Sequence, residues 1–136
     1  MHSEGQKIKR SKQISQNYLD FLDKHIDDVI QHHTLEFLGI NTIASELAVS
    51  HKHLTDVVQK EMGNHPCYFY DLKIIEKIKE MLLTTEMSVA KIAEIFTYDP
   101  SNFSKFFKKW TGMTPKAFRE NTKEIRNISQ LPKSSP

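Results

Sequence analysis

The sequence predicts an all-α fold of two helix-turn-helix subdomains, each a homeodomain-like three-helix unit, joined by a long linker helix. Apolar residues recur every three to four positions in several segments, as they do in amphipathic helices. With 38% hydrophobic residues and only four Gly and five Pro among 136 residues, the composition fits a folded domain rather than a low-complexity chain. In addition, the chain repeats itself at an offset of 49 residues.

The repeat joins eight positions of a first copy to eight positions of a second copy without a gap. The first copy is Ile43, Ala44, Leu47, Val49, Leu54, Val57, Gly63 and Pro66, and the second is Ile92, Ala93, Phe96, Tyr98, Phe103, Phe106, Gly112 and Pro115. Two helices that cross steeply must bury an apolar pair, a small residue and later apolar anchors. The spacing therefore predicts a short helix, a tight turn and a longer helix in each copy.

The N-terminal segment, residues 1–14, is expected to be a basic flexible arm, and it lacks the apolar stretch of a secretory signal. Residues 15–32 follow as an amphipathic helix, because apolar positions such as Tyr18 and Leu22 recur every three to four residues. This helix opens the first subdomain, which we place at residues 15–67.

The first repeat is expected to form a short helix over residues 42–48, a turn at Ala48-Val49 and a longer helix that begins after Ser50 and ends at Gly63. Ser is a favoured N-cap, and Gly can take the left-handed conformation that ends a helix. The inward face of this second helix is expected to hold Leu54, Val57 and Val58, and its outward face Lys52, Thr55, Asp56 and Gln59.

The linker helix is expected over residues 68–84, where a broad apolar stripe continues. About 14 residues of helix span roughly 21 Å, which would make it a stiff spacer. The second subdomain is placed at residues 85–119, with Ser88 as one cap and Asp99-Pro100 as the start of its second helix. That helix is expected to bury Phe103, Phe106, Phe107 and Trp110 and to expose Ser101, Ser104, Lys105 and Lys108. A flexible tail is expected over residues 120–136.

Charge is distributed unevenly along the chain, although the net charge is only +2. Residues 1–14 carry a net charge of +3, residues 15–100 of −7 and residues 101–136 of +6. A polyanion would therefore be attracted by both ends and repelled by the middle. Basic ends that serve only solubility are the alternative explanation.

The segments IASELAVSHKHLTDVVQKEMG, SVAKIAEIF, DPSNFSKFFKKWTGMTP and KAFR resemble the DNA-binding domain of AraC/XylS-type bacterial transcription regulators. The resemblance covers about residues 15–119 and is most specific from Ile92 to Arg119. It implies two helix-turn-helix subdomains that each place a recognition helix in the DNA major groove. It also implies that outward residues near the start of both recognition helices read DNA.

The sequence departs from the family pattern at three places. The turn before the second recognition helix, Thr97-Tyr98-Asp99-Pro100, is shorter than usual and has Thr97 in place of Gly, which could alter the approach angle of that helix. Asp56 stands where members often have Arg or another polar donor, and a carboxylate repels phosphates although it can accept from cytosine. Val58-Gln59 replaces a common Phe-Lys pair, so the first reading helix is expected to bind DNA less strongly than the second.

The resulting functional hypothesis is a sequence-specific regulator that binds double-stranded DNA as a monomer and reads two adjacent major-groove segments, roughly 20 base pairs. Lys105 is expected to contact a base, while Lys109 and Lys116, with the basic arm, position phosphates. RNA polymerase is a second partner considered, through the acidic helix at residues 15–32. The lone Cys67 fits a reducing cytoplasm, and no apolar run is long enough to span a membrane. With the DNA-binding hypothesis, the expected location is the cytoplasm, at the nucleoid.

Two other functional classes were weighed. One is a protein-interaction regulator that has the same fold but weak or lost specific DNA binding, which Asp56 and the acidic middle section favour. The other is an enzyme or metal protein, to which the seven His residues draw attention. His32 and His33 are adjacent and His51 and His53 are two apart, whereas a metal site on a helix prefers a separation of four. No catalytic residue, metal ligand set or cofactor is therefore expected.

Overall fold

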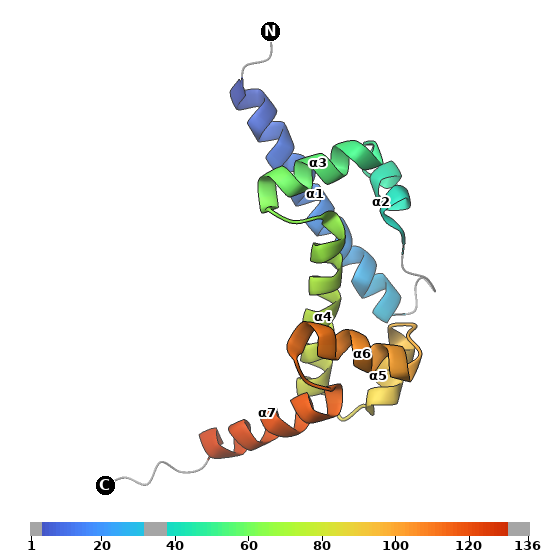
Figure 1. The fold of residues 1–136 in the computed structure, drawn as a ribbon, viewed down its shortest axis with the longest axis vertical. Helices are drawn as coiled ribbons and strands as arrows, with labels where there is room; N and C mark the ends of the chain where they lie inside the picture. The colour runs from blue at the N-terminus through green and yellow to red at the C-terminus, as the bar shows by residue number, and fades with distance from the viewer. Residues whose placement is uncertain (1–3, 32–37, 131–136) are drawn as a thin grey trace, which may run out of the picture. The chain divides into compact units, whose positions relative to one another are not determined.

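The computed structural model describes residues 4–31 and 38–130 of the chain, with side chains described for residues 9–31 and 38–123. All regular secondary structure in these ranges is helical, which confirms the predicted fold class. The helices, shown in Figure 1, are α1 (Glu4–Ile30), α2 (Ile40–Glu46), α3 (His51–Met62), α4 (Pro66–Thr84), α5 (Val89–Ile95), α6 (Pro100–Thr111) and α7 (Pro115–Gln130).

The chain divides into two compact units, Met1–Ile74 and Ile75–Pro136, and the boundary falls inside α4. The long helix expected to join the subdomains therefore runs from one unit into the other. Its first half completes the unit that holds α1, α2 and α3, and its second half opens the unit that holds α5, α6 and α7. Each unit contains one short helix, one turn and one longer helix, in the order that the repeat predicts.

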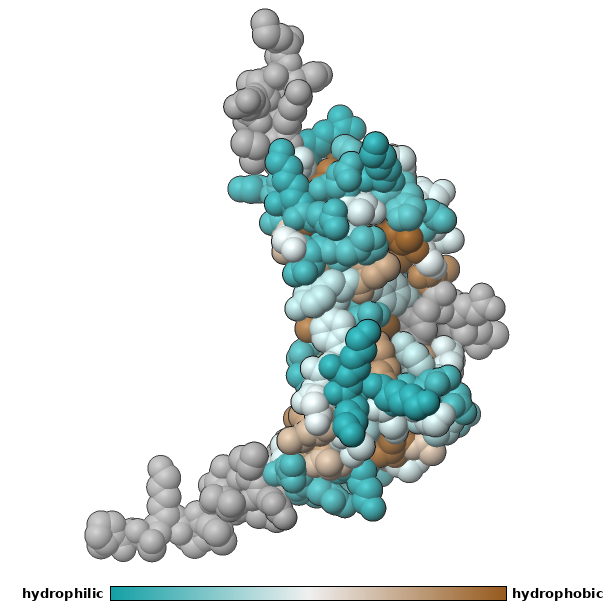
Figure 2. Space-filling model, in the orientation of Figure 1, coloured by the Kyte–Doolittle hydropathy of each residue, from teal (hydrophilic) through white to brown (hydrophobic). Residues whose placement is uncertain are grey.

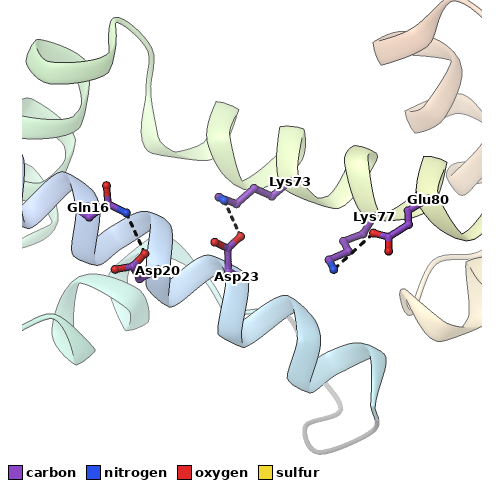
Figure 3. A network of polar contacts seen from close by, with 6 residues as sticks. All are labelled: Gln16, Asp20, Asp23, Lys73, Lys77 and Glu80. Atoms are coloured by element: carbon purple, nitrogen blue, oxygen red, sulfur yellow. Dashed lines mark hydrogen bonds and ion pairs between the residues drawn. The ribbon is translucent and has the colours of Figure 1, made fainter.

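The first unit is built around an apolar cluster contributed by α1, α2 and α3. Its fully enclosed members are Tyr18, Leu22, Ile43, Ala44, Leu54 and Val58. The Tyr18 hydroxyl donates a hydrogen bond of 2.7 Å to the carbonyl of Pro66, at the first residue of α4. On the surface, Lys73 of α4 pairs with Asp23 of α1 at 2.6 Å (Figure 3). These two contacts fix the first turns of α4 against α1.

The helix α1 begins at Glu4, earlier than predicted, so residues 4–14 are its first turns rather than a flexible arm. The physical reason is that the buried face of α1 extends further back than its polar composition suggests. Ser11 and Ile14 are half-buried and precede buried Ser15 and Tyr18 at helical spacing. Residues 1–3, also assigned to the arm, lie outside the described residues.

The second unit has an aromatic core. Its enclosed side chains include Ile78, Leu82, Ile92, Ala93, Phe96, Phe103 and Phe107. The ring of Phe107 packs edge-on against Phe118 of α7, with centroids 5.4 Å apart. Arg119 of α7 donates from Nε to the carbonyl of Leu82 at 3.0 Å and from a terminal nitrogen to the carbonyl of Thr85 at 3.4 Å. Its guanidinium therefore satisfies carbonyls that the end of α4 leaves open.

The helix α7 continues through Gln130, so most of the segment predicted as a tail, residues 120–136, is helical. The start of α7 explains why a helix forms there: Pro115 is its first residue, and the Thr114 hydroxyl accepts a hydrogen bond of 3.1 Å from the Ala117 N–H. Residues 131–136 lie outside the described part.

Candidate nucleic-acid interface

The backbone of the turn between α2 and α3 is repeated in the turn between α5 and α6. In the first turn the Val49 N–H donates to the Ala44 carbonyl at 3.0 Å, and in the second the Tyr98 N–H donates to the Ala93 carbonyl at 2.9 Å. Each pair in one unit lies 49 residues from its counterpart. The sequence repeat is therefore also a repeat of hydrogen bonds.

The residue before each of these donors takes a left-handed conformation, with φ 59° at Ala48 and φ 61° at Thr97. Neither is Gly, although a side chain makes this region unfavourable. Thr97 thus takes the same left-handed conformation as Ala48 at the matched position of the first turn. Its expected effect on the approach angle of α6 stays a prediction. Both longer helices then end at a left-handed Gly, Gly63 and Gly112, each with φ 80°.

The two longer helices differ in how their N-termini are capped. At α3 the Ser50 hydroxyl accepts a hydrogen bond of 3.0 Å from the His53 N–H. At α6 the Asp99 carboxylate accepts from the Ser101 hydroxyl at 2.7 Å and from the Asn102 N–H at 3.4 Å. The hydrogen bond from Ser101, and then that from the Asn102 backbone, lower the pKa of Asp99. Ser101, a predicted DNA contact, is thus already bound to the cap.

The inward face of α3 is as predicted, because Leu54, Val57 and Val58 are buried. Hydrophilic side chains cover the part of Figure 2 in which Figure 1 places α3. Of the four predicted reading residues on α3, Lys52, Asp56 and Gln59 are exposed.

Thr55 is the exception on α3. It is half-buried, and its hydroxyl oxygen is buried without a hydrogen-bond partner among the described residues. The buried oxygen places the hydroxyl away from solvent. Its expected outward orientation is therefore wrong for the hydroxyl.

The helix α6 encloses Phe103 and Phe107, whereas Phe106 and Trp110, predicted to be equally buried, are half-buried. The Phe106 ring stacks on Tyr98 of the preceding turn with centroids 5.4 Å apart. The predicted outward residues Ser101, Lys105 and Lys108 are exposed and Ser104 is half-buried, while the phosphate-positioning candidates Lys109 and Lys116 are exposed. Their contacts with DNA stay predictions.

Sequence reasoning did not select Asn102, which is exposed in the first turn of α6. The 49-residue offset places it at the position of His53, in the first turn of α3. The repeat could therefore have identified both as members of the same surface, next to the predicted reading residues.

In the described part of the chain, no three His, Cys, Asp or Glu side chains come together as a metal site. None of the described helices is both long enough and apolar enough to cross a membrane.

Two exposed helices, each held by an identical turn against its own apolar core, define a tandem helix-turn-helix DNA-binding domain. A helix-turn-helix domain family matches residues 43–121. The chain belongs to the AraC-type helix-turn-helix family of DNA-binding transcription regulators.

Comparison with individual proteins agrees with this assignment. The uncharacterized HTH-type transcriptional regulator YtdP of Bacillus subtilis is 30% identical over 105 residues, which is 76% of this chain and 14% of YtdP. The chain spans less than half the length of the curated relatives that it matches.

Solved structures show the same fold. The C-terminal domain of AraT, a response regulator from Geobacillus stearothermophilus, aligns with a TM-score of 0.69 and 28% identity over 79% of this chain and 84% of that domain. The DNA-binding domain of AdpA, solved in complex with a target DNA, aligns with a TM-score of 0.62 and 19% identity over 76% of this chain and 96% of that domain.

Proposed function

We propose that this chain recognises a specific sequence in double-stranded DNA by placing α3 and α6 in two adjacent major-groove segments. The observation that carries the proposal is that both helices follow a turn closed by the same backbone hydrogen bond, from Val49 to Ala44 and from Tyr98 to Ala93, and that both expose polar side chains. The AdpA domain, which shares the fold, was solved with its target DNA.

One chain is sufficient for this mode of binding. Successive major grooves on one face of B-DNA lie about 34 Å apart, and a dimeric regulator reaches two of them with two subunits. Here a single polypeptide supplies two reading helices, so a monomer covers two turns of the duplex. The site is correspondingly asymmetric, because Lys52, Asp56 and Gln59 of α3 differ from Ser101, Lys105 and Lys108 of α6.

Within this proposal, Lys105 of α6 reads a base. It is exposed, and it lies one turn after Ser101 at the start of the helix. Its ammonium would donate to guanine O6 or N7, a contact worth about 1–3 kcal/mol of discrimination when the geometry is good. Lys109 and Lys116 neutralise phosphates, which makes binding salt-dependent.

The protein acts in the cytoplasm, at the nucleoid, where its target is found. A contact between α1 and RNA polymerase would connect DNA binding to transcription, since α1 carries Asp20, Asp23 and Asp27 on its exposed surface.

Selection of bound sequences from a random duplex pool at near-physiological salt tests the proposal. The expected result is one enriched asymmetric motif with two conserved blocks separated by about one helical turn. A pool without an enriched motif would instead support a protein-interaction regulator with this fold. One block alone would show that only one of the two helices reads DNA.

Binding of the Lys105→Ala variant to the selected duplex and to duplexes with single base changes tests the base contact. Lys123→Ala is the matched control, because Lys123 is an exposed lysine of the same unit that lies outside α6. We expect Lys105→Ala to relax preference at one base pair. Uniform weakening across all duplexes would make Lys105 a phosphate contact.

A further inference from the structure

A groove in the first unit runs between the first turns of α1 and the side of α3. It is lined by Arg10, Ser11 and Ile14 of α1 and by His53 and Lys60 of α3, and it has a volume of about 460 Å³. The groove exists because α1 begins at Glu4. A flexible arm in place of these turns would not hold Arg10 against α3.

Helical spacing brings the groove residues of each helix to one side. His53 and Lys60 are seven residues apart, which is close to two full turns, so both side chains leave the same face of α3. Arg10 and Ile14 are one turn apart on α1. Ile14 also packs against the apolar cluster of the unit and thus forms the floor.

The groove is cationic and holds no carboxylate of its own. Four lysines elsewhere are paired with acidic residues, namely Lys73 with Asp23, Lys77 with Glu80, Lys79 with Glu76 and Lys91 with Glu94 (Figure 3 shows two of these pairs). By contrast, neither Arg10 nor Lys60 pairs with a carboxylate among the residues whose side chains are described. Their positive charges are therefore available to an anion from outside.

We propose that this groove binds a backbone phosphate of the DNA duplex, at the edge of the major groove that α3 enters. This inference rests on the proposed function. A guanidinium, an ammonium, a hydroxyl and an imidazole can all donate to phosphate oxygens, and Arg does so in a planar, two-pronged geometry. Two of the four donors belong to α3, so a phosphate held here lies beside the bases that Lys52 and Gln59 face.

The contact would fix the orientation of α3 rather than read sequence, because phosphate contacts position a protein on the duplex while base contacts specify the sequence. It also offsets the acidity of the first unit. Asp56 lies about one turn from both His53 and Lys60 on α3, but it does not line the groove. The groove thereby attracts the phosphate backbone on one side of a helix whose centre carries a carboxylate.

The test compares Arg10→Ala with Lys24→Ala for binding to the selected duplex. Both residues are exposed cations of α1, but Lys24 lies outside residues 1–14 and only Arg10 lines the groove. We expect Arg10→Ala to weaken binding about tenfold, as for loss of a charge-assisted hydrogen bond, and to reduce the salt slope by about 1. Lys24→Ala should weaken binding less than about twofold, since an exposed distant charge is screened.

A duplex scan with single methylphosphonates then identifies the partner. At one phosphate beside the α3 site, the neutral substitution should weaken wild-type binding as much as Arg10→Ala does. On that duplex, Arg10→Ala should weaken binding no further. Lys60→Ala should likewise have no effect on affinity when this same phosphate is neutral.

Three outcomes would overturn the groove assignment. Arg10→Ala and Lys24→Ala could weaken binding equally, or Arg10→Ala could keep its full effect at every methylphosphonate position. The third outcome is that inorganic phosphate saturates the groove by NMR while Arg10→Ala binds DNA normally. Failure of the wild-type chain to bind any selected duplex would refute the proposed function itself, and it is recognised before any variant is compared.

Discussion

The two helix-turn-helix units share a backbone but not the chemistry that supports it. The turn bonds Val49 to Ala44 and Tyr98 to Ala93 agree within 0.1 Å, at 3.0 and 2.9 Å. Around them, however, aliphatic residues such as Leu54 in the first unit are replaced by aromatic residues such as Phe103 in the second. A helix-turn-helix is thus set by where apolar and left-handed positions fall, and many side chains satisfy those positions.

The units also differ in how the helix after the longer helix is attached. In the first unit the Tyr18 hydroxyl reaches the Pro66 carbonyl at the start of α4. In the second unit Arg119 of α7 reaches the carbonyls at the end of α4. A neutral hydrogen bond in the first unit and charge-assisted hydrogen bonds in the second thus attach the helix that follows. Removing each of them by mutation tests how much each unit depends on this attachment.

The largest expected effect is loss of a core side chain at the matched positions Leu54 and Phe103, both fully buried. Leu54→Ala should lower the free energy of unfolding by about 2–5 kcal/mol and Phe103→Ala by about 3–5 kcal/mol, because each leaves a cavity. Urea denaturation measures both. The control is Lys123→Ala, which should change stability by less than about 0.5 kcal/mol. A negligible cost for either core variant would show that its unit does not depend on that side chain.

The second prediction concerns the hydrogen bonds donated by Arg119 and Tyr18. Arg119→Ala should lower the free energy of unfolding by about 1–2 kcal/mol, since it removes charge-assisted hydrogen bonds to two carbonyls in a half-buried place. Tyr18→Phe should cost about 1–2 kcal/mol, because the ring stays but the Pro66 carbonyl loses its donor.

Thermal denaturation with Arg119→Lys as control separates charge from geometry. Lysine keeps the positive charge but cannot donate along the same two directions as the guanidinium. If Arg119→Lys were as stable as the wild type, the charge at the end of α4 rather than the hydrogen-bond pattern would be what matters.

The third prediction concerns the left-handed turn residues. Thr97→Gly should stabilise the protein by about 1 kcal/mol and Ala48→Gly by less, because the branched Thr side chain is the more strained at φ 61°. The greater freedom of Gly in the unfolded chain subtracts from both gains. Chemical denaturation of the two variants, side by side, measures the difference. A larger gain for Ala48→Gly would mean that strain at Thr97 is relieved by its surroundings.

The repeat made most of this fold predictable, because helix ends and turns depend on local residues such as Ser50, Gly63, Asp99 and Gly112. The extent of α1 was not predictable from composition, since residues 4–14 look polar and, among residues 9–14, whose side chains are described, only Ser11 and Ile14 are half-buried. The same holds for α7 beyond residue 119.

The candidate site was predictable where exposure follows helical period, as at Lys52 and Lys105. It was not predictable where a side chain can either face solvent or contact a neighbouring group, as for the hydroxyls of Thr55 and Ser101. The Arg10 groove was missed for a related reason: it joins residues 43 positions apart in sequence, and only the packing of α1 on α3 brings them together.

The fourth prediction uses pH to separate the units. In the first unit the Nε2 of buried His25 accepts a hydrogen bond of 3.2 Å from the Leu38 N–H, so the imidazole is neutral there. Burial lowers the pKa of His25, and nearby Asp28 only partly opposes this. The folded unit therefore binds this proton less readily than the unfolded chain. Its stability should be full above pH about 6.5, the ordinary value, and should fall as the pH drops below it.

In the second unit the Asp99 carboxylate has a pKa held below its usual range by the Ser101 and Asn102 hydrogen bonds, so its contribution is lost only under more acidic conditions, below pH about 4. Amide hydrogen exchange followed by NMR between pH 7 and pH 3 should therefore show protection falling around α1 and Leu38 before it falls at the start of α6. His25→Gln, which retains an acceptor without a titrating group, should remove the first change and leave the second. If protection at Leu38 still fell over that range in His25→Gln, another group of the first unit would be responsible. Ser50, the cap of α3 in place of a carboxylate, carries no charge to lose, so the acid sensitivity of the two longer helices should differ even though their turns match.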